Sequence, residues 1–306
     1  MDTPVTVVSE SPPRTAIVVR GSDQTFVLDH PSEPGSGVRV AERLGPSEGA
    51  VHLGVSIVEL EPGAAVRGHL HPFEESFFVL EGNARVNLGG QLFFLGAGDF
   101  GVVPVATGHS WTNPFDDRVR LLRVYSPQPR PIAGGGGWGV YAAPDVRLPA
   151  GGERVEELNP RHALVGHFAD GDMPAPGSIL MPGYHGANIQ NVSIRMMVDE
   201  LLGSRHHTLF IVEFAPSGAS KLSASEHFHP FEEMYFFLSG EAVGSFDGER
   251  VPIRAGDLVF AGVGASHGFS AVGEQPVRWI EAQAPLPPAS NGFFFHNDWA
   301  KLDSLA

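Results

Sequence analysis

The sequence predicts an all-β protein built from two tandem barrels of short strands. The first observation is an internal repeat: residues 71–109 align with residues 229–267 without a gap, and 15 of the 39 aligned positions are identical. The second is that glycines fall in register in the two copies, where turns fix the lengths of strands. The third is a composition with 38 Gly and 26 Pro, which favours many short strands over long helices.

The expected strands of the first copy follow one another closely. They cover residues 54–63, 75–82, 83–90, 91–99 and 119–127. Each is rich in apolar or aromatic residues, and most end at a glycine or at a Pro-Gly pair. Strands that recur about every 8–12 residues are typical of a sandwich or a barrel.

The second copy repeats this pattern, and a different kind of segment separates the two. Its expected strands cover residues 207–218, 233–240, 241–248 and 277–285. The intervening segment begins with "SPQPRPIAGGGGWG", whose glycines and prolines predict a linker. We therefore expect an N-terminal barrel over 1–130, a linker over 131–185 and a C-terminal barrel over 186–306. Short helices are expected at 160–168 and in the terminal "FFFHNDWAKLDSLA".

Charge and composition exclude several classes of function. The formal net charge is −15, so a nucleic-acid partner is not expected, because phosphate binding needs a basic face. No apolar run reaches the roughly 18 residues of a membrane helix, so no membrane partner is expected. Cysteine is absent, which excludes disulfides and thiol catalysis. The first 14 residues lack a signal-peptide pattern, and the expected location is the cytoplasm.

A set of histidines and acids in each copy points to a metal site. A strand through residues 69–75 would place His69, His71 and Glu75 on one face, with His109 reaching them from a neighbouring strand. The second copy keeps the spacing with His227, His229, Glu233 and His267. Three imidazoles and one carboxylate suit a divalent first-row metal. A protein also cannot cheaply bury so many polar groups without a partner.

The neighbouring glutamates are expected to do something else. Glu74 and Glu232 have the opposite strand parity, which turns them away from the ligand face and towards an interface or a surface ion pair. Aromatic residues share the ligand face instead, or lie two residues after the third histidine: Phe73, Phe77 and Trp111 in the first copy, and Phe231, Tyr235 and Phe269 in the second. They predict an apolar pocket around each metal.

These motifs resemble those of the cupin superfamily. "GAAVRGHLHPFEESFFVLEG" (63–82) matches the first cupin motif, Gly-x5-His-x-His-x3-Glu-x6-Gly. "GDFGVVPVATGHSWTN" (98–113) resembles the second, with Ala106 in place of a glycine. The second copy is looser, since Gly262 replaces the motif proline and Ala271 the motif asparagine, but its four ligand positions are intact. The chain is thus similar to a bicupin, with two double-stranded β-helix barrels.

The resemblance implies a function for these residues. A bicupin of this ligand set would hold up to one divalent transition metal per barrel, among Mn, Fe, Ni, Cu, Co and Zn. Bicupins with this ligand set include dioxygenases, so the resemblance implies a dioxygenase. Its substrate would be a small chelating molecule with a carboxylate or an enol and an apolar or aromatic body. We expect the first barrel to carry the chemistry, with Glu75 and His109 as catalytic residues, because its motifs depart from the pattern only at Ala106.

Two alternatives stay open. The layout is also similar to ureidoglycine aminohydrolase, a manganese bicupin with non-redox chemistry, although that family's catalytic barrel has Glu and Gln among its ligands where this chain has His227 and His267. The characteristic lid motif of oxalate decarboxylase is not evident. The second alternative is a non-catalytic cupin that senses a ligand or binds metal. The metal, the substrate, the working barrel and assembly into a homo-oligomer are left open by the sequence.

Overall fold

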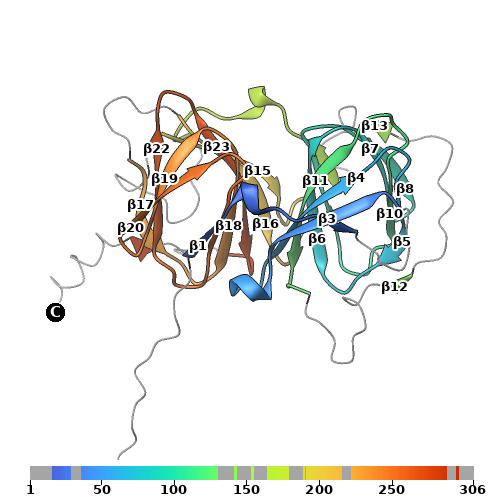
Figure 1. Cartoon of the computed structure of the whole chain (residues 1–306), viewed down its shortest axis with the longest axis horizontal. Coiled ribbons are helices and arrows are strands. Elements are labelled where there is room, and N and C mark those ends of the chain that lie inside the picture. Colours follow the sequence, from blue (N-terminus) through green and yellow to red (C-terminus); the bar gives the residue numbers. More distant parts are fainter. Residues whose placement is uncertain are drawn as a thin grey trace, which may run out of the picture.

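The computed structural model consists of two β-barrels side by side (Figure 1). It describes residues 16–28, 36–129, 141–142, 153–154, 164–178, 189, 191–215, 222–287 and 294–295. Within these residues the helices are single 3-10 turns, such as η1 (Gly21–Asp23), η2 (Pro46–Glu48) and η4 (Asp170–Asp172). None of the described helices is long and apolar enough to cross a membrane. The predicted all-β fold with two barrels is confirmed.

The N-terminal barrel, blue to green in Figure 1, consists of two sheets. A seven-stranded sheet has the order β14-β9-β6-β11-β4-β3-β2, and a six-stranded sheet has the order β12-β5-β10-β7-β8-β13. The strands are β2 (Val27–Leu28), β3 (Val38–Leu44), β4 (Gly54–Leu60), β5 (Ala65–Leu70), β6 (Glu74–Glu81), β7 (Ala84–Leu88), β8 (Gln91–Leu95), β9 (Asp99–Val103), β10 (His109–Thr112), β11 (Val119–Ser126), β12 (Tyr141–Ala142), β13 (Glu153–Arg154) and β14 (Val165–His167).

The C-terminal barrel, yellow to red in Figure 1 except for the dark blue β1, repeats this architecture. Its sheets have the orders β1-β21-β18-β23-β16-β15 and β20-β19-β22-β17-β24. The strands are β1 (Ala16–Val19), β15 (Val192–Val198), β16 (Thr208–Phe214), β17 (Leu222–Phe228), β18 (Glu232–Ser239), β19 (Glu241–Phe246), β20 (Glu249–Arg254), β21 (Leu258–Ala261), β22 (His267–Val272), β23 (Val277–Ala284) and β24 (Phe294–Phe295).

The two larger sheets face each other between the barrels, which explains why their strands are apolar on both faces. Every residue of β4 is buried. Val58 and Leu60 point into the N-terminal barrel, whereas Val55 and Ile57 join a cluster that includes residues of the C-terminal barrel. Alternate side chains of a strand lie on opposite faces, so one strand serves both cores. Full burial of such a side chain is worth about 1.5–3 kcal/mol, which makes this shared cluster a strong link.

The glycines in register close equivalent turns. Gly82 and Gly240 have φ angles of 79° and 78°, in the left-handed region that favours glycine. A Cβ atom would lie 2.4 Å from the Arg118 carbonyl oxygen at the first position and 2.5 Å from that of Pro276 at the second. These turns end β6 and β18 at the same point in each barrel.

Each barrel receives an edge strand from the segment that precedes the other barrel. Strand β1, from the N-terminal part of the chain, pairs with β21 of the C-terminal barrel. Strand β14, which precedes the C-terminal barrel, pairs with β9 of the N-terminal barrel. We call β1 and β14 the crossed arms. The boundaries at 130 and 185 remain predictions, since the arms tie residues of each segment to another part of the fold.

Glu74 and Glu232 form a second reciprocal link. Glu232 accepts hydrogen bonds from the backbone amides of residues 51–53 in the N-terminal barrel, at 2.7–2.9 Å. Glu74 accepts hydrogen bonds from Ser204 and from the amides of Arg205 and His206 in the C-terminal barrel. Both carboxylates are buried. They lie in an interface, one of the two expected places, and that interface is between the barrels of one chain.

The expected helix at 160–168 is wrong within the described residues, because Val165–His167 form β14. The partner strand β9 offers a free sheet edge, and pairing with it decides the conformation of so short a segment. In the terminal segment Phe294–Phe295 form β24, which pairs with β17. The rest of the expected terminal helix lies outside the described residues.

Candidate metal centres

The predicted ligands of each barrel come from three strands and a corner, so the expected single strand over 69–75 is wrong. β5 ends at Leu70 and β6 begins at Glu74, and these strands belong to different sheets. His71 lies in the turn between them. His109, at the start of β10, pairs directly with His69 of β5. The corner therefore brings donors of both sheets to the inside of the barrel, which strand parity could not show.

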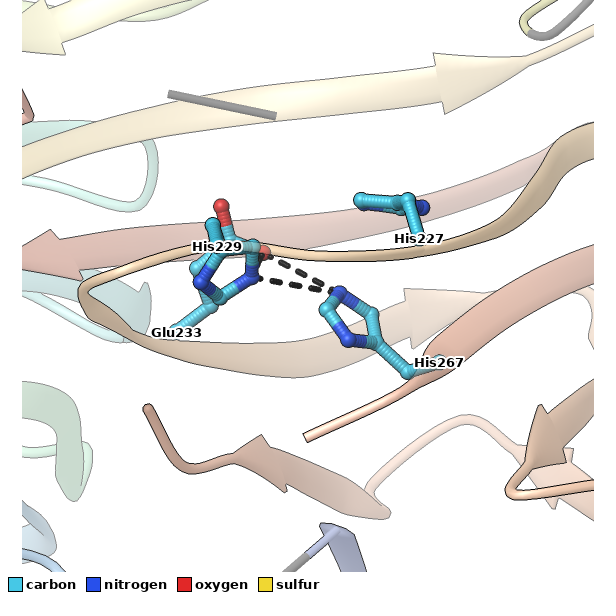
Figure 2. Close-up of side chains that lie close together, drawn as sticks. All are labelled: His227, His229, Glu233 and His267. Atoms are coloured by element: carbon cyan, nitrogen blue, oxygen red, sulfur yellow. Dashed lines mark hydrogen bonds and ion pairs between the residues drawn. The ribbon is translucent and has the colours of Figure 1, made fainter. Parts of the chain in front are cut away.

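The C-terminal barrel brings all four of its predicted donors together. One nitrogen or oxygen atom from each side chain lies within 4.8 Å of the others. The four residues are buried, and Figure 2 shows them converging from β17, the corner, β18 and β22. They are His227, His229, Glu233 and His267.

Backbone carbonyls fix the orientation of the histidine rings in this group. The Nδ1 atoms of His227, His229 and His267 donate to carbonyl oxygens at 2.8, 2.6 and 2.9 Å. A carbonyl oxygen only accepts, so Nδ1 carries the hydrogen of each ring and Nε2 of the neutral ring carries a lone pair. This is the arrangement that metal-binding histidines need.

Several lone pairs meet at close range in the same group. His229 Nε2 lies 2.8 Å from Glu233 Oε2 and 3.3 Å from His267 Nε2, and dashed lines in Figure 2 join His267 to its two neighbours. In neutral rings with Nδ1 protonated, neither Nε2 atom has a hydrogen to donate. Such a cluster of acceptors is stabilised by a cation, so the residues present fit a divalent metal.

The pKa values agree with this protonation. Burial lowers the pKa of His227 well below its ordinary value and also lowers that of His267, so both rings are neutral. Burial would raise the pKa of Glu233, but the neighbouring His229 and His267 outweigh it and hold that pKa well below its ordinary value. The group therefore offers the neutral rings of His227 and His267 and one anionic carboxylate.

The N-terminal barrel brings together three of its four predicted donors. His71, Glu75 and His109 offer atoms within 4.8 Å of one another. His69 lies outside this set, although its ring centroid is 4.1 Å from that of His109. The Nε2 atoms of His71 and His109 and Oε1 of Glu75 are buried without a hydrogen-bond partner. Buried polar atoms without a protein partner are expected of metal ligands, so this group also fits a metal.

The histidines of this barrel have the same backbone anchors. The Nδ1 atoms of His69, His71 and His109 donate to carbonyl oxygens at 2.8, 2.6 and 3.0 Å. Burial lowers the pKa of His109 to about 3 and also lowers those of His69 and His71. Burial would raise the pKa of Glu75, but the charge of Arg123 outweighs it and lowers that pKa.

Sequence reasoning missed the side chains on β11 and β23 that face these groups. Arg123 Nη2 lies 2.9 Å from Glu75 Oε2. Gln283 Nε2 donates to Glu233 Oε1 at 2.7 Å and to Glu281 Oε1 at 3.2 Å. Tyr235, expected only as a wall residue, donates its hydroxyl hydrogen to Glu233 or to His267, whose Nε2 is 2.8 Å away. The aligned strands "VRLLRVYSP" and "VRWIEAQAP" already carried this signal, as charged residues at inward positions.

A small cavity lies beside the C-terminal group. His227, Tyr235 and Glu281 contribute polar atoms to its lining, and the remaining side chains are apolar, with Phe269 and Trp279 among them. Burial, with Glu233 nearby, raises the pKa of Glu281 well above its ordinary value, so this carboxyl is neutral. The cavity has a volume of about 20 Å³, which is room for about one water molecule beside the donor group.

Both barrels match a known domain family. The Cupin domain family matches residues 56–125 in the N-terminal barrel and residues 210–282 in the C-terminal barrel. The two matches contain all four predicted donors of each barrel.

Two curated relatives come from Streptomyces. The polyketide synthase protein CurC of Streptomyces cyaneus is 33% identical over 84 residues, which are 27% of this chain and 53% of that protein. The tetracenomycin polyketide synthase protein TcmJ of Streptomyces glaucescens is 27% identical over 124 residues, which are 40% of this chain and 80% of that protein. This chain thus spans about half the length of CurC.

Solved structures share the two-barrel fold. Oxalate decarboxylase of Lactobacillus farciminis, in its formate complex, aligns with a TM-score of 0.61 and 18% identity, covering 96% of this chain and 91% of that one. Protein Ylba from E. coli aligns with a TM-score of 0.59 and 14% identity, covering 88% and 90%. At these identities the likeness concerns the fold alone.

Proposed function

Because the chain is a bicupin, with a Cupin domain in each barrel, we propose that it is a metal-dependent enzyme that oxidises a small chelating substrate with O2. The substrate class is a compound with a carboxylate or an enol on an apolar or aromatic body. The proposed cofactor is a divalent transition metal in each barrel, drawn from Mn, Fe, Ni, Cu, Co and Zn.

The observation that carries this proposal is the buried donor set of the C-terminal barrel. Its four donor atoms lie within 4.8 Å of one another, and neutral imidazoles meet a single carboxylate there. One negative charge leaves a divalent ion with net positive charge, which attracts an anionic or chelating substrate. A purely structural cluster of lone pairs would be unfavourable without a cation.

The residues around the donors have separate tasks in this proposal. A bound ion would supply Lewis acidity that polarises a substrate oxygen. The carbonyls that accept from Nδ1 keep the rings oriented. Phe269 and Trp279 exclude water from the cavity, and Tyr235 holds its proton between Glu233 and His267, beside the cavity.

The curated relatives support the substrate class. CurC and TcmJ are both named as polyketide synthase proteins. Polyketide chains carry alternating carbonyl groups that enolise and chelate metals, and their cyclised products are aromatic. Both properties agree with metal-binding donors that are surrounded by largely apolar side chains.

The barrel that carries the chemistry is part of the proposal. Sequence motifs favoured the N-terminal barrel, with Glu75 and His109 as catalytic residues, and that prediction stands untested. The geometry favours the C-terminal barrel, because its donor set includes all four residues and the cavity adjoins it. We propose the C-terminal group as the working site.

The test combines metal analysis with oxygen consumption. The purified chain, His229→Ala and His71→Ala are each loaded with Mn²⁺ or with Fe²⁺ under nitrogen. They are then mixed with pentane-2,4-dione and with a panel of polyhydroxylated aromatic compounds. We expect O2 uptake by the wild type and by His71→Ala, and loss of uptake in His229→Ala.

Each other result has a meaning. Uptake that survives in His229→Ala and disappears in His71→Ala would return the chemistry to the N-terminal barrel. Product formation at full rate without oxygen would replace the oxidase proposal with a hydrolase or lyase. Metal content unchanged in both variants would contradict the ligand assignment.

A further inference from the structure

The two barrels carry opposite chemistry at one equivalent position. Arg123 of β11 lies opposite Phe77 in the register of β6, and Glu281 of β23 lies opposite Tyr235 in the register of β18. Phe77 and Tyr235 are themselves equivalent positions of the repeat. A guanidinium in one barrel therefore stands where the other barrel has a carboxyl.

Arg123 is held against the N-terminal donor group. Its Nη2 atom lies 2.9 Å from Glu75 Oε2, and its guanidinium lies 5.1 Å from the centroid of the Tyr125 ring. The side chain is 17% exposed, so little water screens its charge. Because the only carboxylate of this group is already paired with a cation, the positive charges of the arginine and of a metal ion compete for it.

Glu281 has no such effect on the C-terminal group. The carboxyl is buried and accepts hydrogen bonds from Trp279 Nε1 at 2.9 Å and from Gln283 Nε2 at 3.2 Å. The same Gln283 donates to Glu233. Tyr235 of β18 and Gln283 of β23, which bond to Glu233, are uncharged, so Glu233 keeps its full charge for a metal.

A count of charges separates the two sites. The N-terminal group holds the Glu75 carboxylate paired with the Arg123 guanidinium, and the charges of this pair sum to zero. A divalent ion there would leave two uncompensated positive charges in a buried place, whereas the C-terminal group would leave at most one. Buried charge is costly unless it is paired.

We infer that the C-terminal site binds its metal unaided, whereas the N-terminal site binds metal together with a bidentate anion that Arg123 recognises. The anion would take the guanidinium from Glu75 and free that carboxylate for the metal. Planar guanidinium groups match two oxygens of a carboxylate, so the ligand class is a dicarboxylate or a carboxylate next to an enol. The inference rests on the proposed metal sites and adds a division of labour between them.

The experiment uses two forms of the full chain, each with one intact site. His229→Ala, His267→Ala leaves only the N-terminal site, and His71→Ala, His109→Ala leaves only the C-terminal site. Mn²⁺ binding is measured by electron paramagnetic resonance, with oxalate or with neutral oxamide, at matched concentrations of free Mn²⁺. Circular dichroism and thermal unfolding verify that each form is folded.

The expected result is a contrast between the forms. Oxalate raises the Mn²⁺ affinity of the N-terminal site by about 10- to 100-fold, the range found when groups around a metal are changed. Oxamide leaves it unchanged. The C-terminal site binds Mn²⁺ more tightly without oxalate, and oxalate raises its Mn²⁺ affinity by a smaller factor than that of the N-terminal site. The Mn²⁺ affinity of Glu281→Gln is also compared with that of the wild type, to measure what the Glu281 carboxyl contributes at the C-terminal site.

Variants of Arg123 decide whether this residue is responsible. Arg123→Met should strengthen Mn²⁺ binding alone and abolish the effect of oxalate, whereas Arg123→Lys should retain most of that effect. Arg118→Met is the control, since it removes an equal charge from a side chain that is 44% exposed and pairs with Glu59.

Two results would overturn the inference: no gain from oxalate at the N-terminal site, or a gain that persists in Arg123→Met. Because these measurements need no turnover, they are independent of the O2 experiment. Failure of O2 uptake alone would contradict the proposed reaction and leave the division between the sites intact.

Discussion

The histidines of both sites rely on the main chain for their orientation. In each of the six rings Nδ1 donates to a carbonyl oxygen two residues away. The anchor is therefore part of the local backbone conformation at the corner or strand end, and it needs no further side chain. This explains why the spacing of histidines in the sequence is informative even though their partners are not visible in it.

The anionic ligand should matter most at its own site. Glu233→Gln keeps the shape of the side chain but removes the only charge of the C-terminal donor set, so we expect Mn²⁺ affinity there to fall by about 10- to 100-fold. Equilibrium dialysis with metal analysis measures the change. Glu75→Gln is the matched variant and should reduce only the N-terminal occupancy; equal loss at both sites would contradict separate sites.

Glu74 should give the protein a pH-dependent stability. Burial would raise its pKa, but hydrogen bonds from His207, Ser204 and the Arg205 amide outweigh it and lower the pKa from 4.5 to about 2. A carboxyl whose pKa is lower in the folded state than in the unfolded state stabilises the fold at pH values above its unfolded-state pKa. This contribution is lost as the pH falls through the folded-state pKa. We therefore expect Glu74→Gln to cost about 2 kcal/mol at pH 7 and much less at pH 2.

Urea unfolding at pH 7, 4.5, 3 and 2 measures this dependence. Glu81→Gln on the same strand is the control, because the Glu81 side chain is 60% exposed, and it should change stability by less than about 0.5 kcal/mol. A constant loss from Glu74→Gln across the whole pH range would show that the carboxylate charge is not involved.

At the scale of elements, one of the crossed arms, β1, is held by a buried arginine. Arg43 of β3 donates from Nη1 to the Arg20 carbonyl at 3.0 Å and from Nη2 to the carbonyls of Val19 and Gly256 at 3.1 and 3.3 Å. Asp257 binds the same arm through the Gly21 amide and the Arg20 side chain. A residue of the N-terminal barrel thus fastens β1 to the sheet of the other barrel.

Arg43→Met should release this arm. Arg43 is 2% exposed, and the carbonyls that accept from its guanidinium would lose their donors, so we expect a loss of about 2–4 kcal/mol in the free energy of unfolding. Amide hydrogen exchange should quicken in β1 and along Leu258–Ala261. The exposed Arg195→Met on β15 should alter neither, and unchanged exchange in β21 would contradict the role given to Arg43.

The repeat predicted the strands inside each barrel well. It did not predict the pairing of strands that lie far apart in the sequence. Strands near residues 54–63 and 119–127 appear as β4 and β11, because alternating and apolar patterns are local. The pairing of β1 with β21 was not predictable, since four residues, Ala16–Val19, meet a strand more than 230 positions away. Likewise the donor spacing was visible in the sequence, whereas the ion pair of Arg123 with Glu75 needed the register of two strands.

At the scale of the whole molecule, three features join the barrels. They are the shared apolar cluster, the hydrogen bonds that Glu74 and Glu232 each accept from the other barrel, and the crossed arms. If one barrel unfolded, the other would lose all of these contacts. We therefore expect one cooperative thermal transition, with equal calorimetric and van't Hoff enthalpies.

Differential scanning calorimetry of the intact chain provides the measurement. The double variant Glu74→Gln, Glu232→Gln should lower the transition temperature and broaden or split the transition, because both reciprocal links weaken together. Two resolved transitions in the wild type would mean that the barrels unfold independently.

The crossed arms also decide how the chain can be divided. A polypeptide ending after β11 would carry β1, the edge strand that β21 requires, and a second polypeptide beginning before β14 would carry the edge strand that β9 requires. Each fragment would thus hold a piece that completes its companion and that it cannot use itself. Two such fragments, produced separately, should be obligate partners that reassemble into a heterodimer on mixing.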